Sequence, residues 1–191
     1  MKSSFKYLVV GLSVLFLLII IGSLIFTKLF GPTDDEKQQD IEVKFYGSEI
    51  ITINNTLPMT DEVGKKIVED EEKIGIVGYL DFEVKSIVDK NVKYEVYLTK
   101  NGEYETIQDK FVKVYLTDQD ENELLNFKEA RVPTYYDLKL SDTDLSGKTI
   151  YYGILNGSET QKFRLRMWVA DTYALNSNLK RNSVKVNVRV R

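Results

Sequence analysis

Two patterns of apolar residues divide the chain. Residues 7–26 are apolar without one charged side chain, and a helix of this length spans about 30 Å, the thickness of a bilayer's hydrocarbon core. After residue 40, apolar and polar residues alternate over short stretches separated by Gly, Asn, Asp and Ser, which is typical of β-strands and turns. The sequence therefore predicts one transmembrane helix followed by β-structure.

The charges that flank the apolar stretch predict its orientation. Lys2 and Lys6 precede it, and the acidic cluster 34–36 follows it, so we expect a cytoplasmic N-terminus and an exported C-terminal part. A cleaved signal peptide is the alternative, but the stretch is longer than the usual signal and no small-residue cleavage site follows it. The predicted organisation is a cytoplasmic flank (1–6), a transmembrane anchor (7–30), a tether (31–40) and an extracytoplasmic domain (41–191).

The alternation is clearest in three segments of that domain. Residues 92–99, 162–169 and 183–191 place apolar side chains at every second position, which directs one face of a strand into a core. In the second of these segments we expect Leu165 and Met167 inside and Trp168 on the outer face. Less regular patterns predict further strands at 41–46, 48–53, 74–88, 111–116, 135–140 and 149–155.

Turn signals complete the predicted fold. Gly47 with Ser48, and Asn156 with Gly157, predict hairpins between their flanking strands. Residues 54–72 predict a long loop with one helical turn at 61–69. About eight short strands without a long amphipathic helix predict an all-β domain, an immunoglobulin-like or jelly-roll β-sandwich.

Composition removes several classes of chemistry. The chain contains no cysteine and no histidine, which excludes disulfides, thiolate metal sites, Ser-His-Asp and Cys-His triads, and histidine-ligated metals. An exported domain without cysteine fits a bacterial surface better than an animal secretory protein. We therefore expect no cofactor, with calcium as the one metal that the sequence suggests.

The calcium candidate lies after the strand at 111–116. Asp118, Asp120, Asn122 and Glu129 occupy positions 1, 3, 5 and 12 of a loop spaced like a calcium-binding EF-hand. Position 6 carries a glutamate where the motif needs glycine, and the flanking helices are missing. The alternative interpretation is a solvated acidic turn.

Charge is segregated along the exported part. Residues 34–72 contain twelve acidic residues and four lysines, whereas residues 160–191 contain eight basic residues and only Asp171 as an acid. Opposite charges of this kind could bring the acidic segment of one copy of the chain to the basic segment of another, in a head-to-tail contact. The alternative is that the two segments neutralise each other within one molecule.

A basic face is the second candidate site. If the strands at 162–169 and 184–191 are neighbours, their outward side chains form one surface that could bind wall polymers, anionic lipid or an acidic protein. The alternative is an ordinary solvent-facing surface whose charges block edge-to-edge aggregation. Nucleic acid is not expected outside the cell. The residues of this predicted face are Arg164, Arg166, Trp168, Lys185, Arg189 and Arg191.

The order of several segments also carries a resemblance. LPMTDEVGKK, DFEVKSIVDKNVKYEVYLTK, IQDKFVKVYLTD and GSETQKFRLRMWVAD follow one another along the chain. This order resembles uncharacterised exported bacterial proteins with an N-terminal hydrophobic segment and, more distantly, the camelysin/TasA surface-fibre family. The resemblance implies a jelly-roll or immunoglobulin-like sandwich at the cell envelope. Camelysin has been described as a metalloprotease, but we do not carry this activity over, because this chain has no histidine or zinc-ligand pattern.

Two functional hypotheses follow from these observations. The first is a membrane-anchored cell-envelope protein that presents a non-catalytic β-sandwich for binding or surface assembly. The second is an envelope enzyme or accessory subunit that uses carboxylates or calcium. The expected partners are the lipid bilayer, through residues 7–30, and other envelope proteins, wall polymers or copies of the chain itself.

Overall fold

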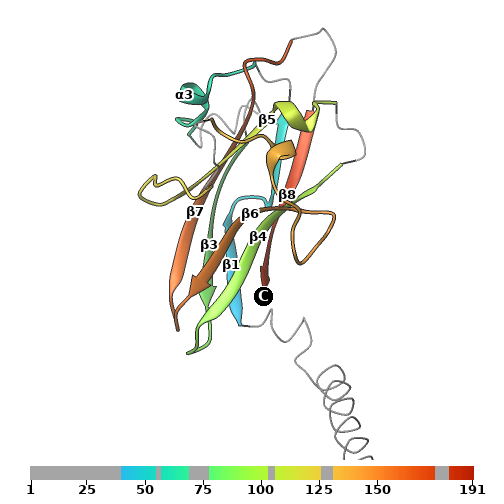
Figure 1. The fold of residues 1–191 in the computed structure, drawn as a ribbon. Coiled ribbons are helices and arrows are strands. Elements are labelled where there is room, and N and C mark those ends of the chain that lie inside the picture. Colours follow the sequence, from blue (N-terminus) through green and yellow to red (C-terminus); the bar gives the residue numbers. More distant parts are fainter. Residues whose placement is uncertain (1–39, 55–56, 69–77, 103–105, 126–130, 175–180) are drawn as a thin grey trace, which may run out of the picture. The chain divides into compact units, whose positions relative to one another are not determined.

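The computed structural model describes residues 40–54, 57–68, 78–102, 106–125, 131–174 and 181–191 (Figure 1). These residues form a β-sandwich of two antiparallel sheets, as predicted, each with four described strands. Sheet A has the order β1 (Ile41–Tyr46), β3 (Gly78–Ser86), β7 (Thr160–Val169), β5 (Val112–Asp118). Sheet B has the order β2 (Ile50–Asn54), β8 (Arg181–Val190), β4 (Val92–Lys100), β6 (Lys148–Leu155). The short helices are α3 (Asp61–Gly64), η1 (Asp109–Phe111) and η2 (Tyr135–Asp137).

The predicted membrane segment lies outside the described residues. The anchor at 7–30, and the tether at 31–40 except for its last residue, belong to the part of the chain whose structure is not described. Within the described ranges, no helix is long and apolar enough to cross a membrane. The sandwich belongs to a compact unit that covers Gln38–Arg191.

Strands that follow one another in the chain lie in different sheets throughout the described residues. Both predicted hairpins are therefore wrong: β1 and β2 separate into sheets A and B, and so do β6 and β7. Asn156 and Gly157 do form a tight turn, in which the Glu159 amide donates to the Asn156 carbonyl at 3.0 Å. Alternation shows which face of a strand is buried. It does not show whether two consecutive strands pair in one sheet or face each other across the core.

The core between the sheets has the predicted register. Phe163, Leu165 and Met167 of β7 are buried between the sheets, together with the inward residues of β4 and β8. The Phe163 ring lies 5.0 Å from that of Phe82 in the same sheet and 5.2 Å from that of Tyr151 in the opposite sheet, measured between centroids. These contacts join the two sheets and fix the outer face of β7.

A second apolar cluster lies on the outer face of sheet A. Trp168 points away from the main core, as predicted, but it is fully buried together with Ile67, Tyr115 and Val132. The segment that contains α3 crosses this face, and its Gly64 backbone lies against the indole ring. The outer face of β7 is thus covered at the end that carries Trp168.

One predicted strand is a helix. Residues 135–137 form the 3₁₀ helix η2, and in the rest of the predicted segment Leu140 makes an isolated bridge to Lys148. A capping box explains the start of η2, because Thr134 and Asp137 bond to each other's backbone. Local side-chain capping therefore overrides the β-propensity of the two tyrosines. The helical turn predicted within 61–69 is confirmed as α3.

Candidate functional site

Polar side chains form a row across the outer face of sheet A. The strand register places Tyr46 of β1 opposite Asp81 of β3, and Asp81 opposite Arg164 of β7. Their chain neighbours Phe82 and Phe163 belong to the core, and successive residues of a strand point to opposite faces. The three polar side chains therefore lie side by side on the face that is turned away from the core.

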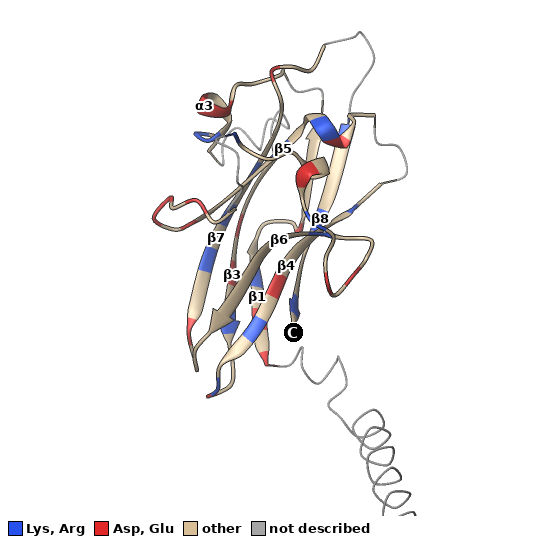
Figure 2. Ribbon diagram, in the orientation of Figure 1, with Lys and Arg blue, Asp and Glu red and all other residues tan. Residues whose placement is uncertain are grey.

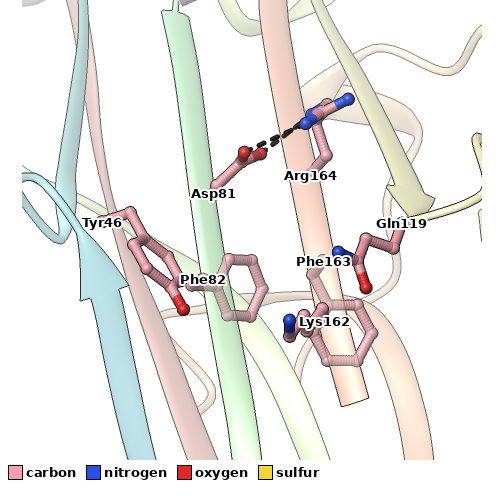
Figure 3. Close-up of a pocket in the computed structure, with 7 residues that line it drawn as sticks. All are labelled: Tyr46, Asp81, Phe82, Gln119, Lys162, Phe163 and Arg164. Atoms are coloured by element: carbon pink, nitrogen blue, oxygen red, sulfur yellow. Dashed lines mark hydrogen bonds and ion pairs between the residues drawn. The ribbon is translucent and has the colours of Figure 1, made fainter.

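Arg164 and Asp81 form the central contact of this row (Figure 3). The guanidinium donates from Nε to Oδ1 at 2.9 Å and from Nη2 to Oδ2 at 3.1 Å, a bidentate geometry. Its Nη1 also pairs with Glu121, in the turn after β5. These carboxylates, Asp81 first, raise the pKa of Arg164 above its ordinary value. The cation is thus fixed in position and in charge.

Glu121 binds a second arginine of β7 as well. Its Oε2 lies 2.9 Å from Nη1 of Arg166, and hydrogen bonding from this residue lowers the pKa of Glu121. Arg166 also donates from Nε to the carbonyl of Ile67 at 2.8 Å, and it is only 4% exposed. The turn after β5 therefore folds back over β7, where Figure 2 shows acidic positions next to basic ones.

A cavity of about 180 Å³ opens beside this network. Tyr46 stands at its border, 52% exposed, and its hydroxyl donates to Glu83 at 2.9 Å. Lys162 of β7 contributes an exposed ammonium group. The lining combines aromatic carbon with donors and acceptors, which suits a small polar group that has one apolar face. The lining residues, all drawn in Figure 3, are Tyr46, Asp81, Phe82, Gln119, Lys162, Phe163 and Arg164.

Tyr79 supports the network from the side of Trp168. Its hydroxyl donates to Oδ2 of Asp81 at 3.1 Å, and its ring centre lies 5.5 Å from the guanidinium carbon of Arg164. Burial, followed by the negative charge of Asp81, raises the pKa of Tyr79 to about 12. Tyr79 therefore remains a protonated donor at neutral pH and helps to orient the carboxylate.

The predicted basic face does not exist as one surface. The prediction required β7 and β8 to be neighbouring strands, but β7 belongs to sheet A and β8 to sheet B. Arg164 and Arg166 are therefore separated from the three basic residues of β8 and its end, and Trp168 is buried rather than available on the surface. The hydrophobic pattern gave the correct face of each strand but contained no information on which strands pair.

The basic residues on sheet B have acidic partners of their own. Lys185 pairs with Glu49 at 2.8 Å, and Arg191 pairs with Asp142 at 2.8 Å while its guanidinium carbon lies 4.4 Å from the centre of a tyrosine ring, that of Tyr152. Arg189 donates to the carbonyl of Thr143 at 3.4 Å. Acidic residues of the same molecule thus balance part of the positive charge that the sequence concentrates at this end.

The end of β5 and the turn that follows it contain three of the four predicted calcium ligands. Oδ1 of Asp118 accepts the backbone amides of Asp120 and Asn122, both at 2.9 Å, and Oδ2 accepts Nδ2 of Asn122 at 2.8 Å. These bonds, the Asn122 side chain first, lower the pKa of Asp118. Glu129 lies outside the described residues. Among the described residues, no group of three or more carboxylates is arranged to hold a metal ion, and calcium binding remains a prediction.

One buried carboxylate was missed from the sequence. The alternation at 92–99 predicts Glu95 on the outer, solvent-facing side of β4, but Glu95 is fully buried, and residues of the loop between η2 and β6 bond to its carboxylate. Its carboxylate accepts the hydroxyls of Thr143 at 2.7 Å and Thr149 at 2.5 Å. The signal that could have revealed it is the run of Ser, Thr and Asp at 141–146, which supplies donors for a buried acid.

Comparison with known proteins adds no relative to this description. No protein-family model matches the sequence, and the search of curated proteins gives no significant match. The geometry of the site therefore carries the functional argument.

Proposed function

We propose that this chain is a membrane-anchored cell-envelope protein whose extracytoplasmic β-sandwich binds a partner and catalyses no reaction. The observation that carries the proposal is the outer face of β1, β3 and β7, where exposed Tyr46 and Lys162 border a cavity. The uncharged stretch at 7–26 and the lysines before it support the anchor and its orientation.

The cavity supports recognition of one group of a larger partner. At about 180 Å³, it lies below the roughly 300–1,000 Å³ that is usual for small-molecule sites. An aromatic ring beside fixed charged pairs suits a sugar ring, whose C–H face packs on Tyr46 and whose hydroxyls bond to Asp81 and Arg164. The partner class that we propose is therefore a wall polymer.

The charge state of the carboxyl groups supports binding over acid catalysis. In the described part of the chain, the carboxyl groups with clearly shifted pKa values are all shifted downward, so they stay ionised at neutral pH and act as acceptors. A general acid needs a raised value instead. These groups belong to Glu62, Asp118, Glu121, Asp137, Asp144 and Glu159.

We also propose that the β-sandwich is of the jelly-roll type. Eight described strands that alternate between two four-stranded sheets are closer to a jelly roll than to an immunoglobulin domain, in which consecutive strands such as A and B share a sheet. A jelly-roll domain fits the proposed role, because its rigid sheet faces present side chains at fixed spacings.

A cosedimentation assay with isolated, protein-free cell walls tests the function. We expect the purified chain to pellet with the walls, and Tyr46→Ala and Lys162→Ala to reduce the bound fraction several-fold. Lys93→Ala is the matched control, because Lys93 is an exposed strand lysine on sheet B. Failure of the wild-type chain to pellet, or equal retention of all three variants, would contradict the proposal.

A further inference from the structure

A lysine and an asparagine meet at one end of the sheet B core. Lys100 ends β4 and lies opposite Val184 of β8 in the strand register. Asn182 precedes Val184 by two residues, so it lies on the same face of the sheet. Val184 is buried in the core between the sheets, and this face is therefore the inner one.

The two side chains touch, and a carboxylate completes the group. Nζ of Lys100 lies 3.3 Å from Oδ1 of Asn182 and 2.5 Å from Oδ1 of Asp109, at the start of η1. Asn182 is only 1% exposed, and its Nδ2 donates to the carbonyl of Ile107 at 3.1 Å. The amide is thus fixed at both ends, with an amine beside its carbonyl and an acid–base group beside the amine.

The surroundings are apolar on the side of the core. The ring centre of Tyr135 lies 4.4 Å from Nζ of Lys100, and both Tyr135 and Ile107 are 2% exposed. The other side opens to solvent, because the side chains of Lys100 and Asp109 are 28% and 39% exposed. A small leaving molecule therefore has a path out of the site.

We propose that Lys100 and Asn182 join in an intramolecular amide bond, formed autocatalytically with Asp109 as the acid–base group. The Asp109 carboxylate takes a proton from the lysine ammonium, and the freed amine lone pair adds to Cγ of Asn182. Asp109 passes that proton to Nδ2, the bond from Cγ to Nδ2 breaks, and ammonia leaves. Asp109 then takes the second proton that Nζ must lose, which leaves a neutral amide nitrogen, and passes it to the departing ammonia, which goes out as ammonium. The new bond joins Nζ to Cγ, and neither an oxidant nor a reductant is needed.

Position is what makes this step accessible. A primary amide is a poor electrophile in water. The fold holds the amine within contact distance of the carbonyl, however, and fixed geometry of this kind gives the amine a high effective concentration. The backbone holds all three groups: Lys100 and Asn182 lie on paired strands, and the amide of Thr106 donates to the carbonyl of Arg181, next to Asn182, at 2.9 Å.

The product would replace a disulfide in a chain without cysteine. It would join β4 to β8 across 82 positions of sequence, closing the chain segment that contains β5, β6 and β7 into a covalent ring. Unlike a disulfide, an amide bond does not respond to the redox potential of its surroundings.

Trypsin digestion of the folded full-length chain, followed by mass spectrometry, tests the bond. Trypsin does not cleave after an acylated lysine, so the linked protein should yield one branched product of residues 94–110 and 182–185. Its mass should be lower than the sum of the two peptides by one ammonia, about 17 Da. Recovery of only the separate peptides, with cleavage after Lys100, would overturn the proposal.

Two variants separate the bond from an ordinary ion pair. Lys100→Arg keeps a cation for Asp109 but offers no nucleophilic amine, and we expect its branched product to be absent. Asp109→Asn keeps the size of the side chain but cannot take the proton, and we expect the yield to fall at least tenfold. Lys85→Arg, an exposed position on β3, is the matched control and should retain the branched product.

Each further outcome also decides the question. If Asp109→Asn forms the bond as fast as the wild-type chain, the role of Asp109 is overturned. If an unfolded wild-type chain forms the bond at the same rate as the folded one, the fold does not direct the reaction, and the proposal fails. If a variant does not fold, the wild-type digest still settles whether the bond exists.

Discussion

Gly64 lies so close to the indole ring of Trp168 that a Cβ atom at residue 64 would stand 2.1 Å from the ring carbon Cε2. The segment with α3 can cover sheet A only because this position has no side chain. Gly64→Ala should therefore lower the free energy of unfolding by about 1–3 kcal/mol, the usual cost of overpacking.

This effect can be measured by urea denaturation followed by tryptophan fluorescence, because the chain has one tryptophan. The emission of Gly64→Ala should also shift towards that of an exposed indole as the segment lifts. Val63→Ala, at the exposed neighbouring position, should change neither quantity. An unchanged Gly64→Ala variant would show that α3 does not pack on Trp168.

Leu165 tests the core register of β7. It is fully buried between the sheets in a central strand, so Leu165→Ala should cost about 2–5 kcal/mol of stability, from the lost transfer energy and the remaining cavity. Leu145→Ala, at a position that is 79% exposed, should stay within about 0.5 kcal/mol of the wild type. Chemical denaturation of both variants makes the comparison, and a harmless Leu165→Ala would reject the register.

The lowered pKa of Asp137 predicts that the fold loses stability in acid. Burial alone would raise its pKa, but hydrogen bonds from Arg131 and Thr134 outweigh burial and lower it from 3.8 to about 2. A carboxyl group with a depressed folded-state pKa stabilises the fold above its unfolded-state value and loses that contribution as the pH falls through the folded-state value.

Asp137→Asn should therefore be less stable than the wild type at pH 5, and the difference should shrink between about pH 4 and pH 2. Thermal unfolding across this pH range measures the effect. A difference that stays constant down to pH 2 would mean that the ionised Asp137 carboxylate contributes nothing to stability.

Salt should have little effect on the association state of the β-sandwich domain. Pairs within one molecule, such as Lys185 with Glu49 and Arg164 with Asp81, already occupy charges that a contact between copies would use. We expect sedimentation of residues 33–191 to give a monomer at both 0.1 M and 1 M salt, where the Debye length falls from about 10 Å to about 3 Å. Assembly at low salt alone would restore the alternative of a head-to-tail contact.

The membrane topology that the sequence predicts can be tested with a protease. If the lysines before the apolar stretch keep the N-terminus in the cytoplasm, protease added to spheroplasts should digest the chain after Pro32. Protection until lysis would reverse the predicted orientation. A soluble cytoplasmic protein of the same cells serves as the control for intact membranes.

The periodicity of the sequence predicted local features well and pairing poorly. Leu165 inside and Trp168 outside follow from alternation along one strand, which depends only on backbone geometry. The cover over Trp168 could not be predicted in this way, because it comes from α3, about a hundred residues earlier in the chain. The candidate site was found in part: Arg164 was named, but Asp81 and Glu121, which fix it, come from other strands and turns.

The strand order also determines how this domain must be made. The residues of paired strands that come nearest in the sequence, Tyr46 and Asp81, are 35 positions apart, so every described ladder requires the closure of a long loop before its first bond can form. Such topologies fold slowly. β8, which follows the other seven described strands in the chain, occupies the place between β2 and β4. Until residues 181–190 are synthesised, β2 and β4 both present open edges, and the partly synthesised chain depends on protection against pairing with its neighbours.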